Sequence, residues 1–246
     1  MKQRPDNWNR VYSRVLAAEK DHGLLGRGDR VLIALSGGAD SLVLLDLLSY
    51  QRGALGRKLG LTVVAGHVPG SFRGRPIAQQ ADLRRTCERL SVDLQVSDRR
   101  LGEEVFSDCF ACSRARRRLL FDLAERCGCN KIALGHNADD LAETALLNIL
   151  FAGHFAAMRP RQPLLNGRVT VIRPLSYVWK SQIAEYCAQR FGPVRQFACP
   201  GGKGSRRLLV RKLLARLEQD GSPVRANVLK AIFNPKPDYL PLRSGT

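Results

Sequence analysis

The amino-acid sequence predicts an α/β protein, in which a parallel sheet carries helices on both faces and a small helical C-terminal region follows. Short apolar runs alternate with helix-length segments, a pattern typical of parallel sheets. With 246 residues and 44% hydrophobic content, the chain can bury one large core. After Pro174 the helical patterns continue without a further strand, so we expect the sheet to end there.

The predicted elements follow one another without an internal repeat. An amphipathic helix is expected first, over residues 7–20, and the apolar runs then indicate strands at 31–35, 61–65, 92–96, 131–134 and 168–173. Further helices are expected at 179–190, 206–217 and 224–233. The expected regions are an N-terminal helix over 1–24, a sheet domain over 25–178 and a helical C-terminal region over 179–246.

The charge balance predicts a polyanionic partner. Lys and Arg number 40 against 22 Asp and Glu, which gives a formal net charge of +18. Nucleic acid is the first expectation for such a surplus, and a solvated basic surface is the alternative. The stretch MKQRPDNWNR lacks the apolar core of a secretory signal, and no run approaches roughly 18 apolar residues. We therefore expect a cytoplasmic protein without a membrane span.

A glycine turn, SGGADS at residues 36–41, comes at the carboxyl end of the first predicted strand and opens a helix. Its backbone N–H groups and the helix dipole favour a phosphate or pyrophosphate, and the glycines let the backbone approach the anion. The aspartate is a candidate ligand for Mg2+. The alternative is that the serines and the aspartate only cap the helix. The residues expected to bind the nucleotide here are Ser36, Gly37, Gly38, Asp40 and Ser41.

Seven cysteines in a reducing compartment are poorly explained by disulfides. Cys109 and Cys112 follow a predicted strand and begin a helix, so we expect them at the same edge as the glycine turn. Their spacing is typical of a redox pair, of half a zinc site or of part of an iron–sulfur site. Cys199, in FACPGG, is the candidate third ligand. Three thiolates would leave one iron of a 4Fe-4S cluster open to an external sulfide. The remaining cysteines are interpreted as buried structural thiols: Cys87, Cys127, Cys129 and Cys187.

The loop after the strand at 131–134 carries Gly135, His136, Asp139 and Asp140, again at the carboxyl edge. We expect Gly135 to contact the nucleotide. A carboxylate here would orient the nucleotide, bind magnesium or move a proton, and helix capping is the alternative. His136 is either an acid/base group or a loop-shaping residue. A basic surface for tracking phosphates is predicted from Arg114, Arg116, Arg117, Arg118, Lys203, Arg206, Arg207, Arg211, Lys212 and Arg216.

The glycine turn, placed after an apolar strand, resembles the pyrophosphate loop of the PP-loop ATPases. These enzymes cleave ATP between its α and β phosphates and attach AMP to a substrate oxygen. The chain as a whole resembles the tRNA 2-thiocytidine synthetases, iron–sulfur members of that group that replace the C2 oxygen of an anticodon-loop cytidine with sulfur. Five segments carry the resemblance in the family's order: GDRVLIALSGGADS, CFACSRARRR, NKIALGHNADDLAETALLNILFAG, VIRPLSY and CPGG.

The resemblance implies the PP-loop ATPase fold, which is adenine nucleotide alpha-hydrolase-like, over the sheet domain, with ATP, Mg2+ and a 4Fe-4S cluster as cofactors. It implies that Cys109, Cys112 and Cys199 hold the cluster, and that Cys199 is also required for catalysis. Asp140 would be a catalytic carboxylate, and Arg116 would face the nucleotide. The implied partners are tRNA and a sulfur donor, either a cysteine desulfurase or free sulfide, and a homodimer is expected.

Three features depart from the family's pattern. Ala39 stands where the loop commonly has Lys, Gly202 takes the last place of a second C-x-x-C, and GHVPGSFRGRP replaces an acidic, Gln-containing stretch. Alternative functions are therefore retained: a thiolase of another nucleoside, a ligase of the lysidine-synthetase type that attacks with an amine, and a zinc-stabilised RNA-binding module that releases no AMP.

Overall fold

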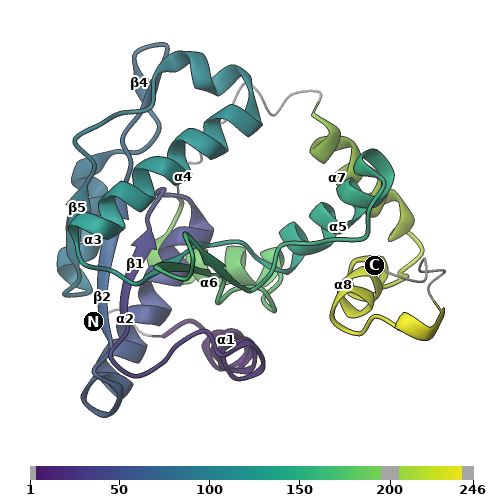
Figure 1. Cartoon of the computed structure of the whole chain (residues 1–246), viewed down its shortest axis with the longest axis horizontal. Helices are drawn as coiled ribbons and strands as arrows, with labels where there is room; N and C mark the ends of the chain where they lie inside the picture. Colours follow the sequence, from purple (N-terminus) through teal and green to yellow (C-terminus); the bar gives the residue numbers. More distant parts are fainter. Residues whose placement is uncertain (1–3, 195–204, 240–246) are drawn as a thin grey trace. The chain divides into compact units, whose positions relative to one another are not determined.

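The computed structural model describes residues 4–194 and 205–239, which form two compact units (Figure 1). Of the described residues, the first unit contains 4–138 and 159–194, and the second contains 139–158 and 205–239. The second unit therefore draws on two separate stretches of the chain. Within the described residues, no helix combines the length and the apolar character needed to cross a bilayer.

The first unit is built on a sheet of six strands in the described residues, in the order β5-β2-β1-β6-β8-β7. At its centre, Val31 of β1 pairs with Val63 of β2 and with Lys131 of β6, in parallel on both sides. The predicted strands are all present, with bounds β1 Arg30–Ala34, β2 Thr62–His67, β5 Asp93–Val96, β6 Lys131–Ala133 and β8 Val169–Ile172. The prediction of a mostly parallel α/β sheet is confirmed.

The edge strand β7 (Arg161–Leu164) was not predicted from the sequence and runs antiparallel to β8. In the sequence, Pro160 and Pro163 give this stretch the character of a proline-rich connection, because proline cannot donate to a strand ladder. Pro163 lies opposite Thr170 of β8. An edge strand accommodates proline because one side of it needs no ladder hydrogen bonds.

Helices cover both faces of the sheet, as alternate residues of β1 demonstrate. Val31 and Ile33 belong to one buried cluster and Leu32 to the other. The first cluster contains residues of α1 (Trp8–His22), α2 (Ala39–Leu59), α3 (Gln80–Arg89) and α6 (Lys180–Phe191). The second contains the buried face of α4 (Cys109–Arg126).

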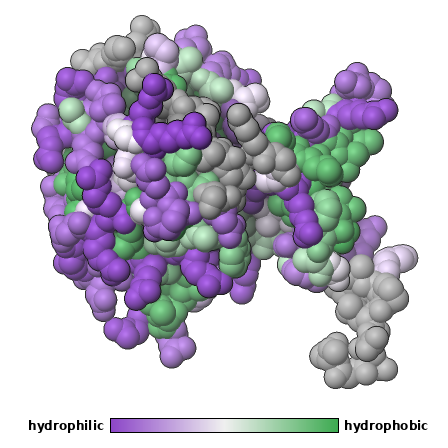
Figure 2. Space-filling view, turned by 90° about the horizontal axis from the view of Figure 1, so that it is seen from above, coloured by the Kyte–Doolittle hydropathy of each residue, from purple (hydrophilic) through white to green (hydrophobic). Residues whose placement is uncertain are grey.

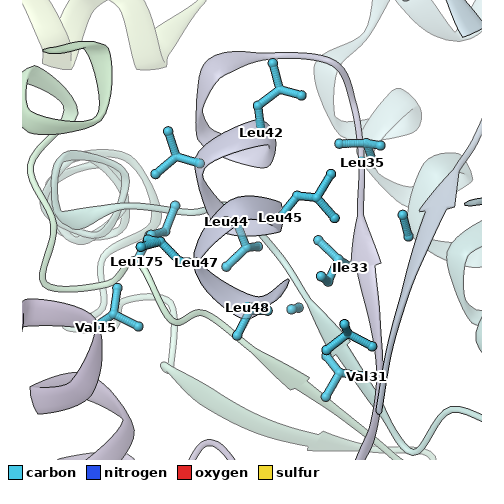
Figure 3. Close-up of a cluster of buried hydrophobic side chains, with 14 of the residues drawn as sticks. Val15, Val31, Ile33, Leu35, Leu42, Leu44, Leu45, Leu47, Leu48 and Leu175 are labelled. Atoms are coloured by element: carbon cyan, nitrogen blue, oxygen red, sulfur yellow. The ribbon is translucent and has the colours of Figure 1, made fainter. Parts of the chain in front are cut away.

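The helix that follows the glycine turn is anchored in the first cluster. Figure 3 shows Leu44, Leu45 and Leu48 of α2 beside Val31 and Ile33 of β1, all fully buried. Burial of each such leucine contributes roughly 1.5–3 kcal/mol. The N-terminal end of α2 is thereby held rigidly at the carboxyl end of β1.

A small hairpin and a short 3-10 helix lie between β2 and α4. The hairpin strands are β3 (Ser71–Phe72) and β4 (Arg75–Pro76), and the 3-10 helix is η1 (Glu103–Ser107). Phe72 packs edge-on against Phe106, with ring centroids 6.1 Å apart. This contact fixes the hairpin on the segment that leads into α4.

The second unit consists of α5 (Ala138–Ala152), which begins at the end of the first unit, with α7 (Arg206–Leu217), α8 (Val224–Phe233) and the 3-10 helix η3 (Pro237–Tyr239). The predicted bounds of α7 and α8 agree with the structure. Helix α6, which we expected in the C-terminal region, instead packs on α2 in the first unit. Figure 2 shows apolar atoms on the surface of the second unit, where the exposed large apolar residues are Ile149, Leu150, Phe151, Phe155, Leu209, Leu213 and Leu217.

Candidate active site

The glycine turn forms a tight loop between β1 and α2, as predicted. Gly37 adopts a φ of +84°, and a side chain there would approach the Cβ of Ala78 to 3.0 Å. Glycine is therefore required at this position for both conformation and space. Gly38 has an ordinary φ of −79° and caps α2. Of these two glycines, only Gly37 therefore adopts a positive φ.

Hydroxyl groups close this loop. Ser41 donates to the carbonyl oxygen of Gly38 (2.9 Å) and accepts from the backbone N–H of Ser36 (3.2 Å). The Ser36 hydroxyl lies 3.1 Å from that of Ser41 and accepts from the Gly38 N–H at 3.4 Å. Both serines thus maintain the shape of the loop, and the start of α2 supplies backbone donors for an anion.

Two residues of the segment after β6 hold Asp40 from the side. Asn137 donates from Nδ2 to Asp40 Oδ1 at 2.8 Å. A Cβ on Gly135 would lie 3.2 Å from the backbone carbonyl carbon and the Cβ of Asp40, so glycine permits the close approach of the two segments. The structure thus brings Gly135 to the loop residues with which it was predicted to act. Asn137 was not predicted, although it lies inside the GHNADD motif.

His67 supports the start of the loop from β2 and was also missed. Its Nδ1 lies 2.8 Å from the carbonyl oxygen of Leu35, the residue before the loop, and the side chain is buried. Since a carbonyl oxygen only accepts, Nδ1 carries the proton. Burial lowers the pKa of His67, and the positive charge of Arg116 acts in the same direction. The imidazole is therefore neutral at neutral pH.

A small pocket opens beside the loop at the carboxyl ends of β1 and β2. Its walls are mostly apolar, and Arg116 is the charged residue of its lining. The arginine suits a phosphate at the rim of this pocket. The lining residues are Ala34, Leu35, Ser36, Gly66, Val68, Ile77, Arg116 and Leu120.

The predicted cysteine ligands begin helix α4. Asp108 caps this helix by accepting from the Phe110 N–H at 2.8 Å. Cys112 is buried, and Arg116 Nη2 lies 4.0 Å from its Sγ. A cation beside the sulfur suits a metal-bound thiolate. Cys109 is the first residue of α4, but its side chain is not among those described, and Cys199 lies outside the described residues altogether.

No three His, Cys, Asp or Glu side chains gather into a metal site within residues 4–194 and 205–239. The predicted set of three cysteines includes Cys199 and therefore extends beyond that range. Of the four cysteines interpreted as buried structural thiols, Cys87, Cys129 and Cys187 are buried, and Cys127 is partly exposed. Burial raises the pKa of Cys87 and Cys187 to about 11, and it also raises the pKa of Cys127 and Cys129.

His136 is held by Arg173, a residue of the VIRPLSY segment that was not predicted to belong to the site. Arg173 is 3% exposed and donates from Nε to His136 Nδ1 at 3.1 Å and from Nη2 to Gln162 Oε1 at 3.2 Å. Burial, followed by the charge of Arg117, lowers the pKa of Arg173 to about 10, so the guanidinium stays protonated at neutral pH. Because Nδ1 accepts this bond, a neutral His136 carries its proton on Nε2.

Asp139 and Asp140 lie in the first turn of α5, in the second unit, where arginines of α7 and α8 pair with the acidic face of that helix. Arg207 Nη1 lies 3.5 Å from Asp140 Oδ1, and Arg225 Nε lies 3.4 Å from Asp139 Oδ1. Arg211 grips Glu143 with two bonds, of 2.7 and 2.9 Å. The basic residues predicted to track phosphates thus include two, Arg207 and Arg211, that bind carboxylates.

Comparison with known proteins agrees with this arrangement. The model of the PP-loop domain family matches residues 10–192. A tRNA-cytidine(32) 2-sulfurtransferase of Geobacter sulfurreducens is 37% identical over 242 residues, which cover 95% of this chain and 92% of the relative. One from Geotalea uraniireducens is 34% identical over 245 residues, covering 95% of this chain and 94% of the relative.

Among solved structures, the U34-tRNA thiolase NcsA from Methanococcus maripaludis, described with its 4Fe-4S cluster, is similar with a TM-score of 0.70. The match covers 92% of this chain and 77% of that chain, at 19% identity. At 19% identity, this similarity shows that the two chains share a fold, and no more.

Proposed function

The chain belongs to the PP-loop family and, within it, to the tRNA-cytidine(32) 2-sulfurtransferases, and from this premise we propose that it uses ATP to replace the C2 oxygen of an anticodon-loop cytidine with sulfur. One observation carries the proposal. Arg116 lines the same pocket as Ser36 of the phosphate loop and lies 4.0 Å from Cys112 Sγ. A single cation thus connects a nucleotide site with a candidate cluster ligand.

The reaction would proceed in two displacements. The C2 oxygen of cytidine attacks the α-phosphorus of ATP, the bond to the β-phosphate oxygen breaks, and pyrophosphate leaves. Sulfide then adds at C2, the C2–O bond breaks, and AMP departs with the original oxygen. Adenylation is needed because the unactivated oxygen is a poor leaving group.

The residues of the first unit would serve the first displacement. The N–H groups at the start of α2 would bind pyrophosphate, and Asp40, oriented by Asn137, would hold Mg2+. Arg116 would stabilise the charge that develops on the α-phosphate.

Cys109, Cys112 and Cys199 would hold the 4Fe-4S cluster, and the arginine beside Cys112 is consistent with a thiolate ligand. When bound, the cluster would supply a reactive sulfur through the iron that no cysteine holds. Asp140 stays a candidate catalytic carboxylate, to which Arg207 would give a defined orientation. The sulfur donor, a cysteine desulfurase or free sulfide, and a homodimer stay predictions.

The principal test is nucleoside mass spectrometry of tRNA from a strain that lacks this protein. Loss of 2-thiocytidine, restored by the wild-type chain, is the expected result. Loss of a different thionucleoside would assign another substrate, and loss of lysidine would favour the ligase alternative. An unchanged nucleoside profile, together with stoichiometric zinc and no ATP-dependent AMP release, would favour the RNA-binding module.

Cysteine variants test the ligand assignment. Cys112→Ser and Cys199→Ser should abolish thiolation and remove iron and visible absorbance, while ATP binding stays within about twofold of wild type. Cys127→Ser is the matched control, since this thiol lies at the far end of α4 and should keep all three properties. Full thiolation by Cys199→Ser would refute its role as a ligand.

A further inference from the structure

We propose that Phe110, stacked with Arg114, is a platform on which an unpaired nucleobase of the tRNA lies flat; this inference rests on the proposed function. Phe110 stands between Cys109 and Cys112, and its side chain is 69% exposed. By contrast, Cys112, two residues later, is buried against the sheet. The helix start thus presents an aromatic ring outward beside the candidate ligands of the cluster.

Phe110 is exposed although it lies in a first helical turn that is fixed by hydrogen bonds. Its backbone N–H donates to the Asp108 carboxylate at 2.8 Å, and the Cys112 N–H donates to the Asp108 carbonyl oxygen at 2.9 Å. The guanidinium carbon of Arg114, one turn further on, lies 4.9 Å from the centroid of the Phe110 ring. An Arg–Phe pair of this kind keeps the ring in place and adds a positive charge at its edge.

Arginines continue the same face of α4. Residues 110, 114, 117 and 118 have the spacing of one helix face, and all four are exposed. Further along, Arg126 pairs with Asp98, and Arg99 reaches Asp122 of the same helix at 3.8 Å. Within the part of the chain that the structure describes, no carboxylate pairs with Arg114, Arg117 or Arg118. These three charges are thus available to an external anion.

An aromatic ring flanked by unpaired arginines matches the chemistry of single-stranded nucleic acid. Bases that are splayed out of a loop stack on aromatic rings and guanidinium planes, while neighbouring phosphates pair with arginines. An acidic protein partner would use the arginines but would gain little from the flat ring. Because every base has a π-face, the platform would position the loop and would not read its sequence.

The experiment measures the binding of unmodified tRNA to the cluster-containing enzyme. Phe110→Leu keeps an apolar side chain of similar size and removes the ring, whereas Phe110→Trp and Phe110→Tyr keep a ring. We expect Phe110→Leu to weaken binding by about 5- to 150-fold, the effect of losing one stacked base. The Trp and Tyr variants should stay within about threefold of wild type.

Salt dependence separates stacking from charge. Phe110→Leu should leave the slope of log Kd against log salt unchanged, whereas Arg118→Ala should reduce it by about one phosphate contact. Iron content and ATP binding are followed in every variant. Wild-type affinity in Phe110→Leu, or equal losses in the Leu and Trp variants, would overturn the platform. A loss of iron in Phe110→Leu alone would also overturn the platform, since it would mean that the ring shields the cluster and does not bind a base.

The outcome is independent of the thiolation assay. If wild-type enzyme binds tRNA and shows the expected order of variants but forms no 2-thiocytidine, the proposed reaction fails and the platform stands. If thiolation occurs and Phe110→Leu binds and reacts like wild type, the platform fails alone.

Discussion

Each of the two units of this protein is stabilised by a different kind of interaction. In the first, two apolar clusters fill both faces of a sheet, and the glycine turn is shaped by backbone and hydroxyl bonds at the edge of that sheet. In the second, helix α8 has no buried residue, and arginines of α7 and α8 grip the carboxylates of α5. The first unit is therefore held mainly by apolar packing, whereas in the second unit ion pairs, which depend on ionic conditions, add to a smaller set of buried apolar residues.

The largest effect should come from truncating the core of the first unit. Leu45→Ala removes a fully buried side chain from α2 and should lower the free energy of unfolding by about 2–5 kcal/mol, because a cavity remains. Leu209→Ala makes the same change at a position of the second unit that is 56% exposed; it is the control and should stay within about 0.5 kcal/mol. Denaturant titrations followed by circular dichroism measure both, and equal losses would contradict the contrast.

Glu19 is a half-buried carboxylate of α1 and predicts a pH dependence for the first unit. Burial raises its pKa from 4.5 to about 7, although Gln51 donates to both carboxylate oxygens at 2.8 Å. The folded protein thus binds this proton more tightly than the unfolded chain. The contribution of Glu19 to the free energy of unfolding should fall as pH rises from about 4.5 to 7, by roughly 2–3 kcal/mol.

The substitution Glu19→Gln should remove that dependence. Relative to wild type, the variant should gain stability at pH 8 and little at pH 5, in denaturation measured at both values. Glu125→Gln is the control, because this side chain is 75% exposed and should change stability equally at the two pH values. A pH profile that is the same in Glu19→Gln and wild type would show that Glu19 does not titrate in this range.

In the second unit, the pair of Arg211 and Glu143 should add measurably to the stability that the buried Val210 and Leu214 of α7 provide. Arg211→Ala leaves the Glu143 side chain, 2% exposed, without its two-bond partner. We expect a loss of about 1–2 kcal/mol, at the low end for charged hydrogen bonds because Arg211 is 42% exposed. Hydrogen exchange of α7 amides measures it locally.

A double-mutant cycle with Glu143→Gln isolates the pair, and the coupling should weaken as salt is added. Arg216→Ala, at an exposed position of the same helix, is the control and should change exchange little. A coupling energy near zero would mean that apolar contacts, and not charge, hold this unit.

Local patterns in the sequence predicted the parallel strands, the glycine turn and helices α7 and α8, because apolar periodicity and glycine chemistry act over a few residues. The edge strand β7 escaped because Pro163 is unfavourable in a strand unless the strand lies at an edge, and edges depend on the whole topology. Likewise, the sequence gives no sign that α6 packs on α2 while α5 joins α7 and α8.

At the site, residues that belong to a recognisable motif were predictable, whereas the residues that hydrogen-bond to them were not. Asp40 stands in a recognisable loop, whereas Asn137 is defined as its partner only by a contact across 97 positions. Arg173 was missed for the same reason, since its buried bond to His136 joins two separate strand ends. Asp140 was predicted as catalytic from its motif, but its ion pair with Arg207 depends on how α7 packs on α5.

The smallest effect should come from Ala39, the first residue of α2, which tests whether the phosphate loop works without a charged side chain. Ala39→Lys should disfavour the unliganded helix by about 0.3–1 kcal/mol, since a cation sits unfavourably at a helix N-terminus. Bound ATP would neutralise that cation, so its affinity should rise about two- to fivefold by isothermal titration calorimetry, and less at high salt. Ala39→Gln has a similar length and no charge, and should leave affinity unchanged. If the Gln and Lys variants both bind ATP more tightly by the same factor, the gain comes from packing of the longer side chain and not from its charge. If Ala39→Lys leaves the affinity unchanged, the backbone donors already satisfy the phosphates.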